Sequence, residues 1–403
     1  MAAARSSDPL FTQWVDAARA ASVADVAAAR SLRLRGGVEK VGPCPGPGCG
    51  GRDRFGLNTR KNVFSCRRCG AKGGPIDLVM LCDGVDFKAA CEILTGSPPP
   101  GSDGSGLTAE DFTRIEQERA TKRAEAAVAA ARFSEAEREK LYRYWERGED
   151  PAGTPVEAYL RLRGLTLPPR ARLRYVPKFK LYHERAGDGG RVASIEVHAG
   201  PVMFAAITGP DGHFSGLHMT WLDLTQADGK ALVADPKTGE FGPAKKVRGS
   251  KTGGRIELAR VEAPAKLVIG EGIETTLSAR QALIEQGQDV SRIAFWSSID
   301  LHNLGGKHVG SVQHPTKRLT DRLGRSMPVR LASAVPDLNA QAIPVPDTVE
   351  EVITLGDGDS DPVLTRLTHE RAAVRWARPG RTVRAVFPPA DVDFNTYLRG
   401  ARP

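Results

Sequence analysis

The chain has 403 residues, and at about 150 residues per domain this length predicts two or three domains with cores of their own. Hydrophobic residues make up 40% of the chain and charged residues 26%, and no apolar run approaches the roughly 18 residues that span a bilayer. These values exclude a peptide-sized scaffold and a membrane protein. The 57 Lys and Arg against 48 Asp and Glu give a net charge of +9, which favours polyanionic partners without specifying nucleic acid.

The N-terminal segment, 1–37, predicts an Ala-rich amphipathic helix, because apolar residues such as Leu10, Trp14 and Ala18 recur at helical spacing up to the glycine pair at 36–37. It lacks the continuous apolar stretch of a secretory signal, so we expect the chain to stay in the reducing cytoplasm. The six cysteines of the chain then need an explanation other than disulfides.

The next segment, 38–96, predicts a compact Cys- and Gly-rich domain. Four cysteines follow the pattern C-x4-C-x16-C-x2-C, namely Cys44, Cys49, Cys66 and Cys69. Four thiolates at this spacing can close a tetrahedron around one structural Zn²⁺ and leave no position for a catalytic water. The flanking sequences CPGPGC and SCRRCGAKGG are too polar and glycine-rich to bury unligated cysteines. Cys82 and Cys91 lie in apolar runs and are interpreted as small core residues.

Basic side chains surround these cysteines, and Phe55 and Phe64 lie between them. Such a combination suits single-stranded nucleic acid, whose phosphates pair with charge and whose bases stack on aromatic rings. The two phenylalanines can also be the small core of the domain, which is the interpretation we favour. The predicted contacts to nucleotide or template are Arg52, Arg54, Arg67 and Arg68.

The cysteine segment resembles the CHC2-like zinc-binding domain of DnaG-type primases, particularly those of phages, plasmids and mobile elements. The match consists of Cys44-Pro45, the run CGGRDRF at 49–55, the run CRRCG at 66–70, the glycine pair at 73–74 and DLV at 77–79. The first knuckle is longer than in that family, but it retains both ligands. The resemblance implies that this zinc ribbon-like domain reads or holds a template.

The Pro/Gly/Ser stretch at 97–106 is typical of a boundary between domains, and 107–147 predicts a charged connector helix, so we assign 97–150 to linker and connector. Segment 151–262 alternates β-type runs with turns and predicts a basic, mixed α+β subdomain. It contains GLHMTWLD at 216–223, in which His218 and Trp221 can stack on a base, although an inward-facing Trp is the role we favour.

A second basic run, GPAKKVRGSKTGGRIEL at 242–258, places cations among glycines that let a backbone approach phosphate. It suggests a clamp on a nucleoside triphosphate or on the template, and the alternative is a flexible basic hairpin. The cations concerned are Lys245, Lys246, Arg248 and Lys251. The segment 216–258 looks like the one that precedes the Toprim domain in mobile-element primases.

From 263 to 403, strand-like and helical runs alternate, which predicts a mainly parallel, Rossmann-like sheet with helices on both faces. Carboxylates follow three of the strands, and the carboxyl ends of parallel strands meet at one edge of a sheet. Crowded carboxylates need a counterion, and their hard oxygens suit two or more Mg²⁺ or Mn²⁺ ions that act on phosphoryl groups. The acidic residues are Glu271, Asp357, Asp359, Asp361, Asp391 and Asp393.

These three motifs, and above all GEGIET at 270–275, resemble the Toprim domain of mobile-element primases. The resemblance implies that Glu271 is a general acid/base or metal-adjacent carboxylate and that Asp357 and Asp359 are metal ligands, with Asp361 and Asp393 as further candidates. Thr275 and Thr396 stand where the family more often has Asp. Asp361 or Glu274 can compensate for this change. The sequence offers no explanation for the long segment at 302–346 between the first and second motifs.

Together the two resemblances imply a DNA primase, an Mg-dependent nucleotidyltransferase that joins ribonucleoside triphosphates into short RNA primers on single-stranded DNA in phage, plasmid or mobile-element replication. No Walker A motif occurs, so the implied partner in a primosome is a separate replicative helicase. One alternative is a Toprim nuclease or a topoisomerase; a topoisomerase would need a catalytic tyrosine, which could be one of the six tyrosines. Another is a catalytically inactive, replication-associated DNA-binding protein, which the two threonines suggest.

Overall fold

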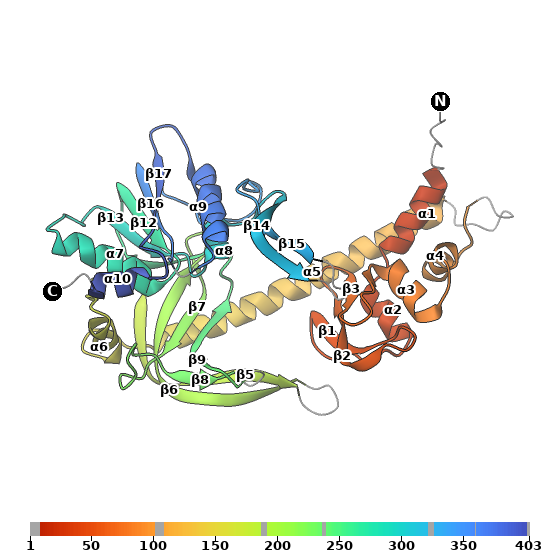
Figure 1. The fold of residues 1–403 in the computed structure, drawn as a ribbon, viewed down its shortest axis with the longest axis horizontal. Helices are drawn as coiled ribbons and strands as arrows, with labels where there is room; N and C mark the ends of the chain where they lie inside the picture. Colours follow the sequence, from red (N-terminus) through yellow and green to blue (C-terminus); the bar gives the residue numbers. More distant parts are fainter. Residues whose placement is uncertain are drawn as a thin grey trace. The chain divides into compact units, whose positions relative to one another are not determined.

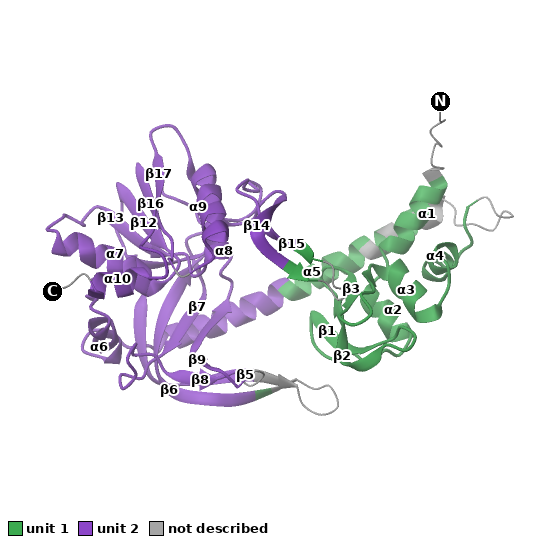
Figure 2. Ribbon diagram, in the orientation of Figure 1, with its two compact units in different colours: residues 1–130, 184–194, 319–327 green, residues 131–183, 195–318, 328–403 purple. Residues whose placement is uncertain are grey.

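The computed structural model describes residues 9–100, 109–186, 192–235, 239–320, 326–358 and 360–400. The chain divides into two compact units, shown in Figure 2. The first comprises 1–130, 184–194 and 319–327, and the second comprises 131–183, 195–318 and 328–403. Within the part of the chain that the structure describes, no helix is long and apolar enough to cross a membrane.

The first unit combines helices with a small antiparallel sheet (Figure 1). Its strands pair in chain order: β1 (Glu39–Cys44), β2 (Gly50–Asn58), β3 (Val63–Cys66) and β4 (Lys72–Gly73). Helices α3 (Pro75–Asp83) and α4 (Phe87–Thr95) follow the sheet. The N-terminal segment forms two helices and not one, α1 (Pro9–Arg19) and α2 (Val23–Ala29), because the Ser22 side chain accepts the backbone N–H groups of residues 24 and 25 and starts a new helix.

The core of this unit contains the two phenylalanines for which the sequence allowed either a core role or a base-stacking role. Phe55 and Phe64 are buried, with stacked rings whose centroids are 5.4 Å apart, and they pack with Trp14 and Leu78 in one apolar cluster. The core interpretation is confirmed. The predicted connector helix also forms, as α5 (Ala109–Glu146), and its last turns bury Leu141 in the second unit.

The second unit is built on one nine-stranded sheet in the order β10-β7-β6-β11-β13-β12-β16-β17, with β5 paired to β6. Its first half is antiparallel between β10 and β7, β7 and β6, and β6 and β11. The strands are β5 (Leu173–Ala186), β6 (Val192–Thr208), β7 (Phe214–Trp221), β10 (Lys245–Gly249) and β11 (Arg255–Ala259). Helix α6 (Pro155–Leu162) precedes them, and β8 (Leu232–Ala234) pairs with β9 (Phe241–Pro243) in a separate two-stranded sheet.

The other half of the sheet is parallel, as the alternation of strands and helices predicts. The strands β13 (Ile293–Ser297), β12 (Lys266–Gly270), β16 (Glu351–Leu355) and β17 (Thr382–Val386) lie side by side in that order. The helices of this half are α7 (Ile273–Glu285), α8 (Leu301–Gly305), α9 (Pro362–Trp376) and α10 (Phe394–Gly400).

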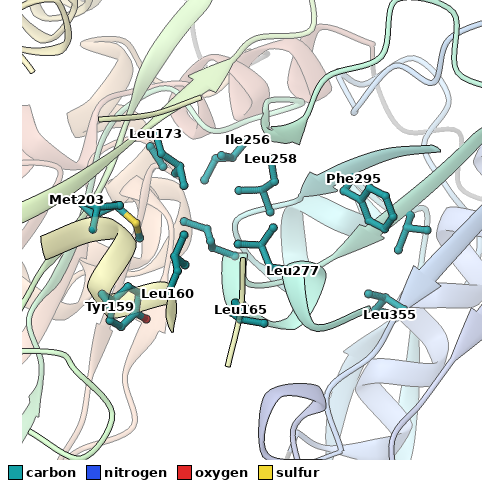
Figure 3. Packing of buried hydrophobic residues seen from close by; sticks show 14 of the residues in the cluster. Tyr159, Leu160, Leu165, Leu173, Met203, Ile256, Leu258, Leu277, Phe295 and Leu355 are labelled. Atoms are coloured by element: carbon teal, nitrogen blue, oxygen red, sulfur yellow. The ribbon is translucent and has the colours of Figure 1, made fainter. Parts of the chain in front are cut away.

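Side chains of the parallel strands point alternately to two cores, one on each face of the sheet. Val268 and Phe295 pack with Leu277 of α7 in one cluster, part of which Figure 3 shows. Leu267 and Ile269 pack with residues of α8 and α9 in the other cluster. Helices therefore cover both faces of the sheet (Figure 1).

The sheet runs without a break across the predicted boundary at 262/263, because β11 pairs antiparallel with β13 through Ile256 and Ser297. The α+β segment and the C-terminal segment thus share one sheet and one compact unit. Between β13 and β16, the segment 302–346 that sequence reasoning left unexplained contains a two-stranded hairpin of β14 (Ser311–Thr320) and β15 (Ser326–Ala332).

Candidate functional site

The four predicted zinc ligands come together at the ends of β1 and β3 and at the turns that follow these strands. The Sγ atoms of Cys44 and Cys69 are 3.8 Å apart, those of Cys49 and Cys66 are 3.6 Å apart, and all four lie within 4.8 Å of one another. A tetrahedron with Zn–S bonds of about 2.3 Å has S–S edges of about 3.8 Å. The cluster therefore has the donor type and spacing to hold a zinc ion.

The surroundings of the cluster favour a bound cation. Burial raises the pKa of the Cys44 and Cys66 thiols, so that they become thiolates at neutral pH only when positive charge is supplied. Backbone N–H groups of Gly46 and Arg68 donate to the Cys44 and Cys66 sulfurs at 3.4 Å. Hydrogen bonds of this kind stabilise sulfur ligands in their bound geometry.

Two of the arginines that the sequence assigned to nucleic acid contribute to this knuckle. Arg54 and Arg68 each donate from Nη1 to the carbonyl oxygen of Cys49, at 3.4 and 3.1 Å. Arg52 and Arg67 are exposed. A nucleic-acid contact by any of the four stays a prediction.

The carboxylate motifs meet at the carboxyl edge of the parallel strands. Strands β12 and β16 pair with Gly270 opposite Leu355, so Glu271 and the loop that begins at residue 356 leave the sheet at the same level. In that loop Asp357 accepts a hydrogen bond of 3.2 Å from the Thr275 hydroxyl. Asp359 lies outside the described residues.

The third motif also reaches this edge. The backbone N–H of Asp391 donates to the carbonyl oxygen of Gly358 at 2.9 Å, which joins the loop after β17 to the loop after β16. Gly358 has no room for a side chain, since a Cβ there would lie 2.4 Å from the Pro389 carbonyl oxygen. Asp393 instead starts α10, and its carboxylate accepts the backbone N–H of Thr396 at 2.6 Å.

Asp361, a predicted metal ligand, has other partners. One carboxylate oxygen accepts the first backbone N–H groups of α9, from residues 363 and 364, at 3.0 and 2.9 Å. The other oxygen bonds to His314 Nε2 at 3.2 Å and to the Lys317 ammonium. Lys317, together with the helix N–H groups, lowers the pKa of Asp361 to about 2. Both oxygens of Asp361 are thus engaged within the protein.

Glu274, the second candidate to compensate for Thr275, points to a different cluster. Its carboxylate pairs with Lys230 Nζ at 2.9 Å and accepts a hydrogen bond from the Tyr159 hydroxyl. Burial by itself raises the pKa of this carboxyl, but the charges of Lys230 and Lys245 outweigh burial and hold the pKa well below its usual range. Thr275, by contrast, lies among the motif residues as a hydrogen-bond donor to Asp357.

The cations of the second basic run have partners within the second unit. Lys246 donates to the Tyr182 carbonyl oxygen at 2.6 Å, Arg248 pairs with Glu137, and Lys251 pairs with Asp300. Burial lowers the pKa of Lys245, which is close to Glu274. Their role in nucleotide or template binding stays a prediction. Trp221 is fully buried and donates from Nε1 to the Phe179 carbonyl oxygen at 2.7 Å, as expected of an inward-facing Trp.

A loop that sequence reasoning missed supports the first motif. At the end of β13, the Ser297 hydroxyl donates to the Glu271 carbonyl oxygen at 2.7 Å, and the hydroxyl of the next residue, Ser298, donates to the Gly270 carbonyl oxygen at 3.1 Å. The next residue, Ile299, has a φ of 76°, which is strained for a β-branched side chain. The serine pair that ends the strand-like run RIAFWSS at 292–298 was the available signal.

Comparisons with known proteins give limited matches. The family model described as "Domain of unknown function (DUF7146)" matches residues 135–258, less than half of the chain. No curated protein matches the chain.

Several solved structures match the chain at low sequence identity. The Aquifex aeolicus primase, with its zinc-binding and RNA polymerase domains, is 15% identical with a TM-score of 0.29, and the match covers 96% of this chain and 82% of that one. A DNA primase domain from Pseudomonas aeruginosa is 14% identical with a TM-score of 0.34, over 66% of this chain and 74% of that one. The primase fragment of the bacteriophage T7 primase-helicase is 12% identical with a TM-score of 0.29, over 89% and 95%. At these values the likenesses do not by themselves define an activity.

Proposed function

We propose that the chain is a DNA primase, a nucleotidyltransferase that makes short RNA primers on single-stranded DNA in the replication of a phage, plasmid or other mobile element. The observation that carries this proposal is the meeting of the GEGIET motif and the Asp357 loop at one edge of a parallel sheet, through the pairing of Gly270 with Leu355 and the bond between Thr275 and Asp357. The four-cysteine cluster in the first unit supports it.

In the proposed reaction the 3′-hydroxyl oxygen of one ribonucleotide attacks the α-phosphorus of the next. A new phosphodiester bond forms, the bond between the α-phosphorus and its bridging oxygen to the β-phosphate breaks, and pyrophosphate leaves. Mg²⁺ or Mn²⁺, when bound, would neutralise charge on the reacting phosphates. Carboxylate oxygens on small, glycine-containing loops fit such an ion, and the residues that would hold it are Asp357, Asp359 and Glu271.

The chain's own residues have distinct tasks in this scheme. Glu271 would accept the proton of the attacking hydroxyl, and its backbone is held by Ser297. Thr275 fixes the orientation of the Asp357 carboxylate and adds no charge, so the site needs less cationic compensation than one with Asp at that position. The first unit, with its four-cysteine cluster, would hold the template, and a separate helicase would supply single-stranded DNA.

The test is metal-dependent incorporation of labelled ribonucleotides on a panel of unprimed single-stranded templates. Wild-type protein is compared with the double variant Asp357→Asn, Asp359→Asn and with the control Asp347→Asn, which removes a carboxylate whose side chain is 95% exposed. We expect short products from the wild type and the control, and at least a hundredfold less from the double variant, in keeping with the loss of preorganised charge stabilisation.

Two other results would contradict the proposal. Relaxation or nicking of supercoiled DNA by the wild type, without nucleotide incorporation, would indicate a Toprim nuclease or topoisomerase. Unchanged DNA binding by wild type and double variant, with no product on any template and with the helicase added, would indicate a non-catalytic DNA-binding protein.

A further inference from the structure

The hairpin of β14 and β15 lies in the chain between the first and second carboxylate motifs, and its strands form a sheet of their own. All of β14 is exposed except His314. A single two-stranded hairpin is marginally stable at best in water. The base of the hairpin, outside residues 319–327, belongs to the second unit.

The base of the hairpin is fixed by two arginines of α9. The side chain of Arg371, of which 1% is exposed, donates to the carbonyl oxygens of Ser333 at 2.6 Å and Gly305 at 3.2 Å. Arg375 donates to the carbonyl oxygens of Lys307 at 3.1 Å and Asp337 at 2.9 Å. Both ends of the inserted segment are thus attached to the helix that follows the second motif.

The hairpin is also bonded to the second motif loop itself. His314 accepts the backbone N–H of Lys317 at Nδ1, at 2.8 Å, which leaves Nε2 to donate to Asp361 in the neutral ring. Lys317 pairs with the same carboxylate. Asp361 follows Asp359 by two residues in the chain, so these contacts join β14 to the end of the loop that we propose holds the metal.

The charge of the hairpin is strongly one-sided. The described residues 307–320 and 326–336 contain four Lys and Arg and no Asp or Glu, while the whole chain carries a net charge of +9. Arg318 and Arg330, one on each strand, are exposed. An isolated sheet with this charge and this exposure is typical of a surface that neutralises phosphates.

We propose that the β14–β15 hairpin is a nucleic-acid-binding arm that holds the phosphate backbone of the single-stranded DNA template beside the carboxylate edge. This inference rests on the proposed function for the choice of single-stranded DNA. The charge favours a polyanion, and the attachment to the Asp361 loop puts the base of the arm next to the place where template and nucleotide would meet.

The test measures binding of a fluorescent single-stranded oligonucleotide by anisotropy between 50 and 200 mM salt, without nucleotides, so that it is independent of primer synthesis. The variant Arg318→Ala, Arg330→Ala removes two charges. With about 0.7 counterions released per phosphate contact, the slope of log K against log salt should fall by about 1.4. Over this fourfold range of salt, the wild type should then lose about sevenfold more affinity than the variant.

Two comparisons separate charge from structure. Arg318→Lys, Arg330→Lys keeps both charges and should restore the wild-type slope. Arg161→Ala, Arg366→Ala removes two exposed arginines from helices and should leave the slope unchanged.

A second probe is a photocrosslinker placed at Val312 on β14, which should label the oligonucleotide, while the same group at position 366 should not. Equal slopes in the alanine variant and the wild type, or no crosslink from position 312, would overturn the proposal. If the arm binds DNA but no primers form under any condition, the proposed primase function is wrong, while the proposal that the hairpin binds DNA is supported.

Discussion

Replacing Glu274 with Gln tests whether this motif residue serves the fold or the metal. The change keeps the shape of the side chain but removes the charge that Lys230 and Lys245 face. The Lys230 side chain is 7% exposed and that of Glu274 is 13% exposed. Removal of one partner of a buried pair costs about 3–5 kcal/mol, and the residual exposure of Glu274 places the loss in free energy of unfolding near the lower limit, about 3 kcal/mol.

The assay is urea unfolding of the second unit, followed by the fluorescence of buried Trp221 and Trp296. Because the folded-state pKa of Glu274 is lowered, its stabilisation is present above the unfolded value near 4.5 and is lost as the pH falls below it. The Gln variant should lack this part of the acid sensitivity. Its loss of stability should therefore be largest at neutral pH.

The matched control is Glu370→Gln, since Glu370 pairs with Arg366 and their side chains are 45% and 64% exposed. Exposed pairs of this type contribute about 0.5 kcal/mol or less. A structural role for Glu274 would be refuted if Glu274→Gln lost less than about 1 kcal/mol, well short of the cost of breaking a buried pair, while the concentration of Mg²⁺ needed for activity rose. That pair of results would make Glu274 a metal ligand.

Three further predictions concern other parts of the structure. Cys66→Ser should lower the zinc content of the protein below the one ion per chain expected of the wild type, as measured by native mass spectrometry. It should also remove hydrogen-exchange protection from the first unit only. Burial lowers the pKa of His369 to about 4, so stability should fall as the pH drops below the unfolded value near 6.5; about 2 kcal/mol of the loss between pH 7 and 5 should be absent in His369→Gln. Gly358→Ala should cost about 1–3 kcal/mol in thermal unfolding, because its Cβ overlaps carbonyl oxygens of the third motif loop, whereas Gly242→Ala, with no atom within 4 Å, should be neutral.

Local patterns in the sequence predicted much of the architecture. Apolar runs such as KLVIG and EVITL are buried parallel strands, as the alternation with helical segments indicated, and carboxylates do follow them at the edge of the sheet. The spacing of four cysteines predicted the cluster that the structure shows. The cysteine signal depends on residues that are close together in the chain. The strand signal depends on burial, because a strand inside a parallel sheet is covered on both faces and is therefore a continuous apolar run.

Tertiary packing decided which polar groups meet across long separations in sequence. Glu274 bonds to Tyr159, 115 residues away, and Asp361 bonds to His314, 47 residues away, although the motifs alone left both acids as possible metal ligands. The continuity of the sheet across residue 262 likewise depends on the pairing of β11 with β13. The sequence by itself determined the strands, the cysteine spacing and the order of the motifs. The sequence did not show which carboxylates face the site and which are neutralised inside the fold. The tertiary structure decides this, because a buried charge is stable only when it is paired with an opposite charge or a hydrogen-bond donor.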